Sequence, residues 1–246
     1  MLKNFKLTIE YDGSAYHGWQ RQATEPTIQA EIEKALMTMT CQNITLIGSG
    51  RTDAGVHAYG QTANFICDTN LTPEVFQRGL NSLLPPDIVI TTCTAVPEAF
   101  NARHDAKSKT YHYRILNRHL PAAVGRQYAW HVPQALDPAA MRRAGHHIIG
   151  THDFKAFEGA GSPRAHTTRR VIHADLVERD EGNLIFEIEG NGFLKFMVRN
   201  IVGTLVDVGL AKITSDDFKT ILLSKDRKLA GVTAPAHGLV LTQVTY

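Results

Sequence analysis

Apolar and polar side chains alternate over residues 5–12, at the start of the chain. Successive side chains of a strand point to opposite faces of a sheet, so this alternation predicts a strand with one buried face. Residues 28–39 instead carry apolar side chains three and four positions apart, which predicts a helix that starts near Pro26 and Thr27. Further strands are predicted at residues 44–49, 61–67 and 88–95, and a second helix at residues 72–83. The predicted order is β-α-β-β-α-β.

The rest of the chain repeats this order of elements without an obvious repeat of sequence. Strands are predicted at residues 109–116, 168–178, 184–190 and 239–245, and helices at residues 137–149, 193–210 and, as a short addition, from Ser215. The order β-α-β-β-α-β is ferredoxin-like. We therefore predict an α+β fold in which two ferredoxin-like halves, residues 1–105 and 106–246, join antiparallel sheets around a central cleft. Such clefts are preferred ligand sites.

The composition is typical of a globular protein, with 43% hydrophobic and 20% charged residues among 246. No apolar run approaches the roughly 20 residues of a membrane span, and the first residues lack a signal-peptide pattern, so we expect a cytoplasmic protein. The three cysteines form no C-x-x-C pair, and the twelve histidines show no spacing typical of metal ligands. Neither a disulfide framework nor a metal site is predicted.

The net charge of +2 is unevenly distributed. Residues 1–102 hold 6 basic and 10 acidic side chains, whereas residues 103–246 hold 20 and 14. Six basic residues and one acid lie within residues 103–131, among four aromatic side chains. Basic charge mixed with aromatic rings is what an RNA backbone with accessible bases would favour, but an ordinary solvated surface explains it equally well.

The most unusual chemistry lies in the glycine-rich turn of residues 47–58, which follows an apolar run. It fits neither a dinucleotide fingerprint, which needs glycine where Asp53 stands, nor a P-loop, which needs Lys and Ser or Thr where Val56 and His57 follow Gly55. A lone carboxylate can act as a covalent nucleophile if a nearby cation keeps it ionised. The structural alternative is a tight polar turn in which Asp53 caps backbone N–H groups.

Arg199 is a candidate for that cation. The predicted helix around it is too apolar for a surface helix, and Lys195, Arg199, Gly203 and Asp207 share one stripe at four-residue spacing. An arginine on a mostly buried helix needs an anionic partner. That partner is either a functional carboxylate or a structural one, Asp207 or Asp175.

Tyr111 lies on a predicted strand, where it could stack on a base and offer its hydroxyl for proton transfer. Core packing is the alternative for Tyr111 or Tyr113, which the alternation places on the same face. Two polar loops, residues 13–22 and 151–170, could contact a ligand. The side chains that we select from them as candidate substrate contacts are Arg21, Gln22, Arg164 and Arg169.

The segment Gly50-Arg51-Thr52-Asp53-Ala54-Gly55-Val56-His57 resembles the active-site motif of the tRNA pseudouridine synthase A family. Further segments resemble those of the family in the same order: Tyr11-Asp12-Gly13, Gly18-Trp19-Gln20-Arg21-Gln22, Phe100-Asn101-Ala102-Arg103, Lys109-Thr110-Tyr111-His112-Tyr113, Asp153-Phe154 and Met197-Val198-Arg199-Asn200-Ile201-Val202-Gly203. The resemblance covers nearly the whole chain.

This resemblance implies the pseudouridine synthase fold and the isomerisation of uridine to pseudouridine at positions 38, 39 and 40 of the tRNA anticodon stem-loop. It also implies a homodimer that needs no metal or organic cofactor, with tRNA lying across both subunits. Asp53 matches the family's nucleophile, and Tyr111 matches the tyrosine that stacks on the target base. Arg199 matches the basic residue that pairs with the aspartate, and Arg51 matches an arginine implicated in handling the flipped nucleotide.

Two other functions stay open at this point. One is a non-catalytic structured-RNA-binding protein or chaperone, and the other is the same chemistry at a different RNA uridine. The chaperone leaves Asp53 unexplained, because a carboxylate in the centre of the loop would repel phosphate. The sequence also leaves open whether Asp53 attacks C6 of the base or C1′ of the ribose.

Overall fold

The computed structural model describes residues 1–161 and 166–246, and the chain forms two compact units. The first unit comprises Met1–Lys107 with Leu241–Tyr246, and the second comprises Ser108–Val240. The division predicted from the sequence lies between residues 105 and 106. The last six residues, which the prediction placed with the second half, cluster with the first unit.

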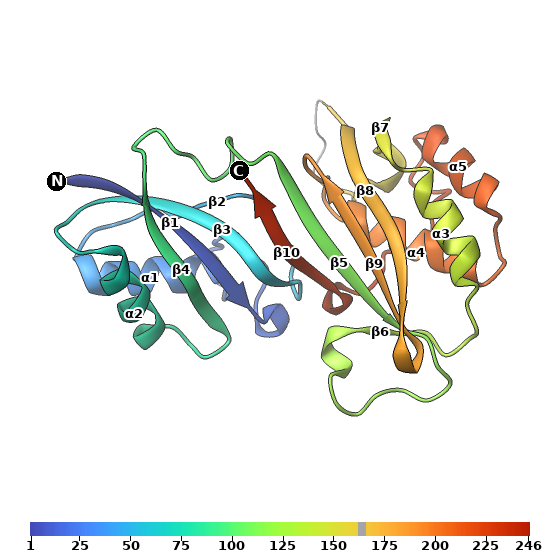
Figure 1. Cartoon of the computed structure of the whole chain (residues 1–246), viewed down its shortest axis with the longest axis horizontal. Helices are drawn as coiled ribbons and strands as arrows, with labels where there is room; N and C mark the ends of the chain where they lie inside the picture. The colour runs from blue at the N-terminus through green and yellow to red at the C-terminus, as the bar shows by residue number, and fades with distance from the viewer. Residues whose placement is uncertain (162–165) are drawn as a thin grey trace. The chain divides into compact units, whose positions relative to one another are not determined.

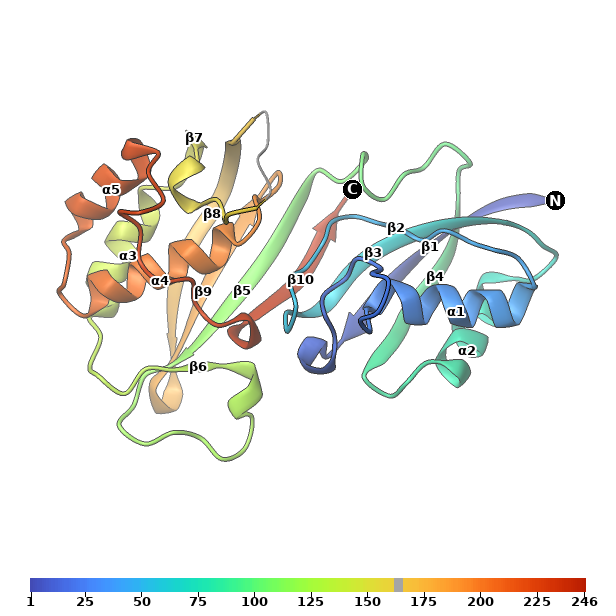
Figure 2. The ribbon, with the colours of Figure 1, turned by 180° about the vertical axis from the view of Figure 1, so that it is seen from behind.

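The first unit has two layers, a sheet and a pair of helices. Its elements are β1 (Leu2–Tyr11), α1 (Ile28–Thr40), β2 (Ile47–Gly48), β3 (His57–Asp68), α2 (Pro73–Leu83) and β4 (Ile88–Val96). The strand order is β4-β1-β3-β10, where β10 is Leu239–Thr245, and β2 pairs with β3. β1 runs antiparallel to β3 and β4, and α1 and α2 lie side by side on one face (Figures 1 and 2). The predicted β-α-β-β-α-β order is confirmed.

Three phenylalanines form the core between this sheet and its helices. Phe76 of α2 lies 4.8 Å from the ring of Phe5 on β1 and 5.1 Å from the ring of Phe65 on β3, measured between ring centroids. All three side chains are at most 1% exposed. Burial of such large apolar side chains is the main force that holds the helices on the sheet.

The opposite face of the same sheet is covered by the segment that follows β4. Asn4 precedes Phe5 on β1 and therefore points away from the helices. Its amide nitrogen donates to the carbonyl oxygens of Pro97 and Phe100, at 3.1 and 2.9 Å. Asn64 of β3 donates to Asn4 and accepts the N–H of Ala102 at 2.8 Å. Buried amides thus hold residues 97–102 in place.

The second unit is also a sheet with helices packed on one face (Figure 2). Its elements are β5 (Ser108–Leu116), β6 (Trp130–His131), α3 (Pro138–His146), β7 (Gly150–Asp153), β8 (Thr168–Arg179), β9 (Asn183–Gly190), α4 (Met197–Gly209) and α5 (Ser215–Ser224). The strand order is β5-β9-β8-β7, with antiparallel neighbours, and β6 pairs in parallel with β5. The predicted elements are all present, and the short strands β6 and β7 are additional.

Residues 151–170 were predicted as a polar loop, and this was wrong for their first part. Strand β7 is followed by a 3-10 helix, Lys155–Phe157, in which Ala156 and Phe157 are buried. The ring of Phe157 stacks on that of Phe218 in α5, with 5.6 Å between the centroids. Charged residues around these apolar positions hide them in the sequence pattern.

The apolar helix predicted at residues 193–210 begins later, at Met197. Phe196 precedes it with φ of 60°, a left-handed conformation that cannot belong to a right-handed helix. Lys195 is therefore not on the helical stripe that was predicted to carry it together with Arg199.

Candidate active site

Asp53 lies in a turn between β2 and β3 of the first unit, and its side chain is partly buried. The N–H of Val56 donates to the carbonyl oxygen of Asp53 at 3.2 Å and closes the turn. Gly55 adopts φ of 78°, which glycine tolerates without strain. Its N–H donates to the carbonyl oxygen of Tyr16 at 3.3 Å. The aspartate is thus presented from a closed, conformationally fixed turn.

The loop that follows β1 lies directly against this turn. The N–H of Trp19 donates to the carbonyl oxygen of Thr52 at 3.2 Å, and the Tyr11 hydroxyl lies 2.8 Å from Oγ1 of Thr52. A Cβ on Gly18 would lie 2.5 Å from the carbonyl oxygen of Thr52 and 3.1 Å from the carbonyl carbon of Asp53. Burial raises the pKa of Tyr11, so its hydroxyl stays neutral. Residues 11–19 therefore fix the backbone on the N-terminal side of Asp53.

Arg51, Arg21 and Gln22 also belong to the first unit, and all three are exposed. Nε of Arg51 donates to Oε1 of Gln20 at 3.0 Å, and Nη1 of Arg21 donates to Oε2 of Glu33 at 2.8 Å. Gln22 donates to the carbonyl oxygen of His17. The exposed arginines on the Asp53 side are thus anchored through polar contacts rather than extended freely into water.

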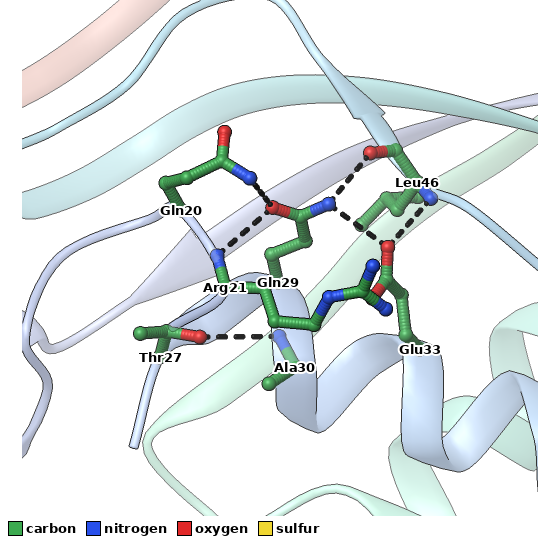
Figure 3. A network of polar contacts seen from close by, with 7 residues as sticks. All are labelled: Gln20, Arg21, Thr27, Gln29, Ala30, Glu33 and Leu46. Carbon is green, nitrogen blue, oxygen red and sulfur yellow. Dashed lines mark hydrogen bonds and ion pairs between the residues drawn. The ribbon is translucent and has the colours of Figure 1, made fainter. Parts of the chain in front are cut away.

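Two polar residues that contact this region, Gln29 and Glu33, were not identified from the sequence. Gln29 and Glu33 lie on α1, beside the apolar stripe that begins at Ile28 and Ile32, and both are buried. Two polar side chains four positions apart on a buried helix face are a signal in themselves, because polar groups are buried only when they are hydrogen-bonded. Their contacts are shown in Figure 3.

Tyr111 and Tyr113 lie on β5 in the second unit, on the same face, as the alternation predicted. Tyr113 is fully buried, and its hydroxyl donates to the carbonyl oxygen of Pro235 at 2.8 Å. Burial raises the pKa of Tyr113, which keeps it neutral. Tyr111 is 8% exposed, and its ring meets that of Phe193 edge to face, with 5.2 Å between centroids. Core packing therefore describes Tyr113, whereas Tyr111 keeps a small accessible surface.

Arg199 lies on α4 of the second unit, where its Nε donates to the carbonyl oxygen of Ala234 at 2.7 Å. The two structural partners suggested by the sequence pair with other residues. Asp207 lies 2.9 Å from Nζ of Lys212, and Asp175 lies 3.3 Å from Nε of Arg142. The guanidinium of Arg199 is thus oriented by a backbone carbonyl.

Of the two basic candidates in the loop of residues 151–170, only Arg169 can be placed. It is the second residue of β8 and is partly exposed. Its Nη1 donates to the carbonyl oxygens of His166 and Thr168. Arg164 lies outside the described residues.

Within residues 1–161 and 166–246, no group of three or more His, Cys, Asp or Glu side chains could hold a metal ion. No helix of that same part of the chain is long and apolar enough to cross a membrane.

Comparison with known proteins decides the family. The sequence model of tRNA pseudouridine synthases matches residues 7–105 and 144–246. Proteins named tRNA pseudouridine synthase A from Acetivibrio thermocellus, a Thermoanaerobacter species and Clostridium acetobutylicum are 47%, 46% and 48% identical to this chain, over 100% of both chains. The chain belongs to the tRNA pseudouridine synthase A family. It is therefore a pseudouridine synthase, an isomerase that converts uridine to pseudouridine, with the α+β fold of that family.

Among solved structures, the chain is distantly similar to an archaeal box H/ACA sRNP Nop10-Cbf5 complex, with a TM-score of 0.35 and 12% identity over 96% of this chain and 46% of that chain. A Cbf5-Nop10-Gar1 complex gives a TM-score of 0.39 and 13% identity, over 96% and 48%. Both matched chains are about twice as long as this one.

Proposed function

We propose that this protein isomerises uridine to pseudouridine at positions 38, 39 and 40 of the tRNA anticodon stem-loop, with Asp53 as the nucleophile. Membership of the tRNA pseudouridine synthase A family supports the reaction and the class of RNA. The observation that carries the role of Asp53 is its place in a fixed turn, held by Gly18 and Trp19 on one side and closed by Val56 on the other. The stem-loop positions rest on the family resemblance.

The chemistry needs a carboxylate and a trapped base, and it needs no redox step. The target uridine first leaves the base stack, at a cost of a few kcal/mol. The Asp53 carboxylate then forms a bond to C6 of the base or C1′ of the ribose, and the bond between N1 and C1′ breaks. The uracil turns within the site and rejoins C1′ through C5. Loss of the C5 proton, uptake of a proton at N1 and release of Asp53 complete the isomerisation, so atoms and electrons balance within the nucleotide.

The other proposed roles follow the residues that match the family motif. Tyr111 stacks on the target base and takes part in moving the C5 proton, which its small accessible surface permits. Arg199 keeps Asp53 ionised, because a nearby cation lowers the pKa of a carboxyl group. The side chains that contact the RNA are those of Arg51, Arg21, Gln22, Arg164 and Arg169. The working form in this proposal is a cytoplasmic homodimer with tRNA across both subunits.

Substitution of Asp53 tests the chemical role. We expect Asp53→Asn to reduce release of tritium from C5-tritiated tRNA by a factor on the order of 10⁴ or more, as loss of a nucleophile does in other enzymes. Binding of tRNA by the same variant, measured by filter retention, should change little. Asp180→Asn is the matched control, because Asp180 lies in the exposed turn between β8 and β9. Tritium release at the unaltered rate from a verified Asp53→Asn protein would remove Asp53 from the nucleophile role.

The position of the modified uridine is tested separately. Transcripts of one tRNA are made with uridine at 38, 39 or 40 singly, and a fourth carries cytidine at all three positions. Position-resolved mapping should find pseudouridine in the first three and none in the fourth. Pseudouridine elsewhere in the fourth transcript would assign the same chemistry to another uridine. Saturated binding with no pseudouridine in any transcript would favour a structured-RNA-binding protein.

A further inference from the structure

Helix α1 carries a polar pair in its buried face. Gln29 and Glu33 are one helical turn apart and are 5% and 7% exposed. Nε2 of Gln29 donates to Oε1 of Glu33 at 2.9 Å and to the carbonyl oxygen of Leu46 at 3.1 Å. The N–H of Leu46 donates in turn to Oε1 of Glu33 at 2.9 Å (Figure 3). The pair therefore joins α1 to the segment that leads into the Asp53 turn.

The remaining acceptors of the pair hold the loop after β1. Oε1 of Gln29 accepts the N–H of Arg21 at 3.0 Å and Nε2 of Gln20 at 2.8 Å. Oε2 of Glu33 accepts Nη1 of Arg21 at 2.8 Å (Figure 3). Gln20 also contacts Arg51, because its Oε1 accepts the N–H of Arg51 Nε at 3.0 Å. Both arginines of this side are thus linked to the same buried pair.

Packing alone does not explain why this buried helix face carries a glutamine and a glutamate. Burying a carboxylate and an amide costs free energy unless each polar atom finds a partner, and an apolar residue could fill the same helix face. Both oxygens of Glu33 and both polar atoms of Gln29 have partners. What the pair adds over an apolar side chain is a defined position for Gln20 and Arg21.

Both arginines keep an outward side for a ligand. The side chain of Arg21 is 57% exposed, and that of Arg51 also lies at the surface. A guanidinium carries five N–H donors in a rigid, planar fork, so one donor used inward leaves others directed away. Planar donors of this kind suit the phosphodiester oxygens of RNA. Side chains ordered before binding lose less conformational entropy when the RNA binds.

We propose that Gln29 and Glu33 are positioning residues for RNA binding by Arg21 and Arg51. The inference rests on the proposed function, because that function assigns the two arginines to the RNA. Gln29 and Glu33 do not touch the RNA themselves, and they act by fixing the two guanidinium groups beside the Asp53 turn.

A double-mutant cycle on tRNA binding tests this role. The Kd for an unmodified tRNA transcript is measured for Gln29→Met in the wild-type background and in an Arg21→Met/Arg51→Met background, at an ionic strength at which the latter still binds. We expect Gln29→Met to raise Kd about tenfold in the first background. That increase corresponds to the loss of one charge-assisted hydrogen bond between an arginine and the RNA. In the second background we expect a change of less than about twofold, because positioning acts only through the arginines.

Two further variants keep the test decisive. Gln20→Met cuts the link between Gln29 and Arg51 at a half-buried position, so it decides the question if Gln29→Met fails to fold, and it should raise Kd only where Arg51 is present. Gln77→Met is the matched control, since Gln77 lies on α2 and donates to the carbonyl oxygen of Thr91 at 2.7 Å. It should leave Kd within about twofold of the wild-type value.

The outcomes separate this proposal from the proposed function. Equal increases of Kd in both backgrounds would overturn the positioning role, whether or not the wild-type protein forms pseudouridine. Coupling through the arginines without formation of pseudouridine would leave the positioning role intact and overturn the proposed reaction. A wild-type protein that does not bind tRNA would overturn both.

Discussion

The guanidinium carbon of Arg199 lies 4.9 Å from the centroid of the Phe196 ring. The Lys195 ammonium lies 5.0 Å from the same centroid. Phe196 reaches this position through φ of 60°, a conformation that costs an L-residue about 1–2 kcal/mol. Cation–π attraction between the ring and the two cations offsets part of that cost. Phe196 thus orients Arg199 from one side, and the carbonyl oxygen of Ala234 fixes its Nε.

The first prediction concerns this ring. Replacing it in Phe196→Leu removes the cation–π contact, so the Arg199 side chain gains freedom. If Arg199 acts in the reaction step, the single-turnover rate should fall roughly threefold to tenfold, for a contact worth about 1 kcal/mol. The Kd for tRNA should change by less than about twofold, since the loss is in orientation rather than charge. Phe196→Tyr keeps the ring and is the control. A wild-type rate for Phe196→Leu would contradict an orienting role.

A second prediction concerns the loop that supports the Asp53 turn. Gly18 and Gly125 both have positive φ, 89° and 74°, so alanine at either position is strained by about 1–2 kcal/mol. A Cβ on Gly18 would also lie 2.5 Å from the carbonyl oxygen of Thr52, whereas one on Gly125 meets nothing within 4 Å. Gly18→Ala should therefore lower the free energy of unfolding by about 1–3 kcal/mol more than Gly125→Ala, in urea denaturation. Only Gly18→Ala should slow tritium release. Equal losses in both variants would show that the close approach is relieved at no cost.

The order of elements was predictable because it depends on short-range physics. Alternation and helical periodicity located the strands and helices of both units, and capping residues located several helix ends. Asp137 caps the start of α3 as expected, because its side chain accepts the N–H of Ala140 at 2.9 Å. Thr27 does the same for α1, through the N–H of Ala30. The Asp53 turn was predictable for a similar reason, because glycines and the aspartate lie within one short segment.

Features decided by distant partners were not predictable. The pattern before α4 continues a helix, but Phe196 turns left-handed where its ring packs against Gly159, so closely that a Cβ there would lie 2.4 Å from it. Charged neighbours hide the apolar positions Ala156 and Phe157 in the sequence, and Phe157 finds its packing partner, Phe218, only in α5. Gln29 and Glu33 find their partners at Leu46 and in the loop of residues 20–21. Sequence periodicity can mark such residues as unusual on a buried face, but it does not identify their distant partners.

A third prediction concerns acid stability. The Thr167 hydroxyl donates to Oδ1 of Asp153, and Nζ of Lys225 lies 3.1 Å from Oδ2. The hydrogen bond from Thr167, with a smaller effect of Lys225, holds the pKa of Asp153 below its ordinary value. A carboxyl group with a lowered pKa in the folded state stabilises the protein above its unfolded pKa, about 3.9, and this contribution is lost as the pH falls through the folded pKa.

Asp153→Asn should therefore lower the free energy of unfolding at neutral pH, and it should lose less stability than the wild type as the pH falls below about 4. Urea denaturation at several pH values measures both effects. Asp180→Asn, in the exposed turn between β8 and β9, controls for the loss of one negative charge. The explanation fails if Asp153→Asn and the wild type lose stability in parallel over this range.

The last prediction concerns residues 97–102, the segment that covers one face of the sheet in the first unit. Asn64 is 1% exposed, its Oδ1 accepts the N–H of Ala102 at 2.8 Å, and its Nδ2 donates to Oδ1 of Asn4 at 3.0 Å. Asn64→Ala leaves the buried N–H of Ala102 without this acceptor, so it should lower the free energy of unfolding by about 1–3 kcal/mol. Asn191→Ala is the matched control: it removes an amide that accepts the N–H of Arg170 at 3.0 Å, but at an exposed position where water replaces it. That variant should lose less than about 1 kcal/mol, and hydrogen exchange of the Ala102 amide should accelerate only in Asn64→Ala. Equal losses of stability in the two variants, with slow exchange at Ala102 in both, would mean that residues 97–102 are held by packing of Phe100 rather than by the buried amides.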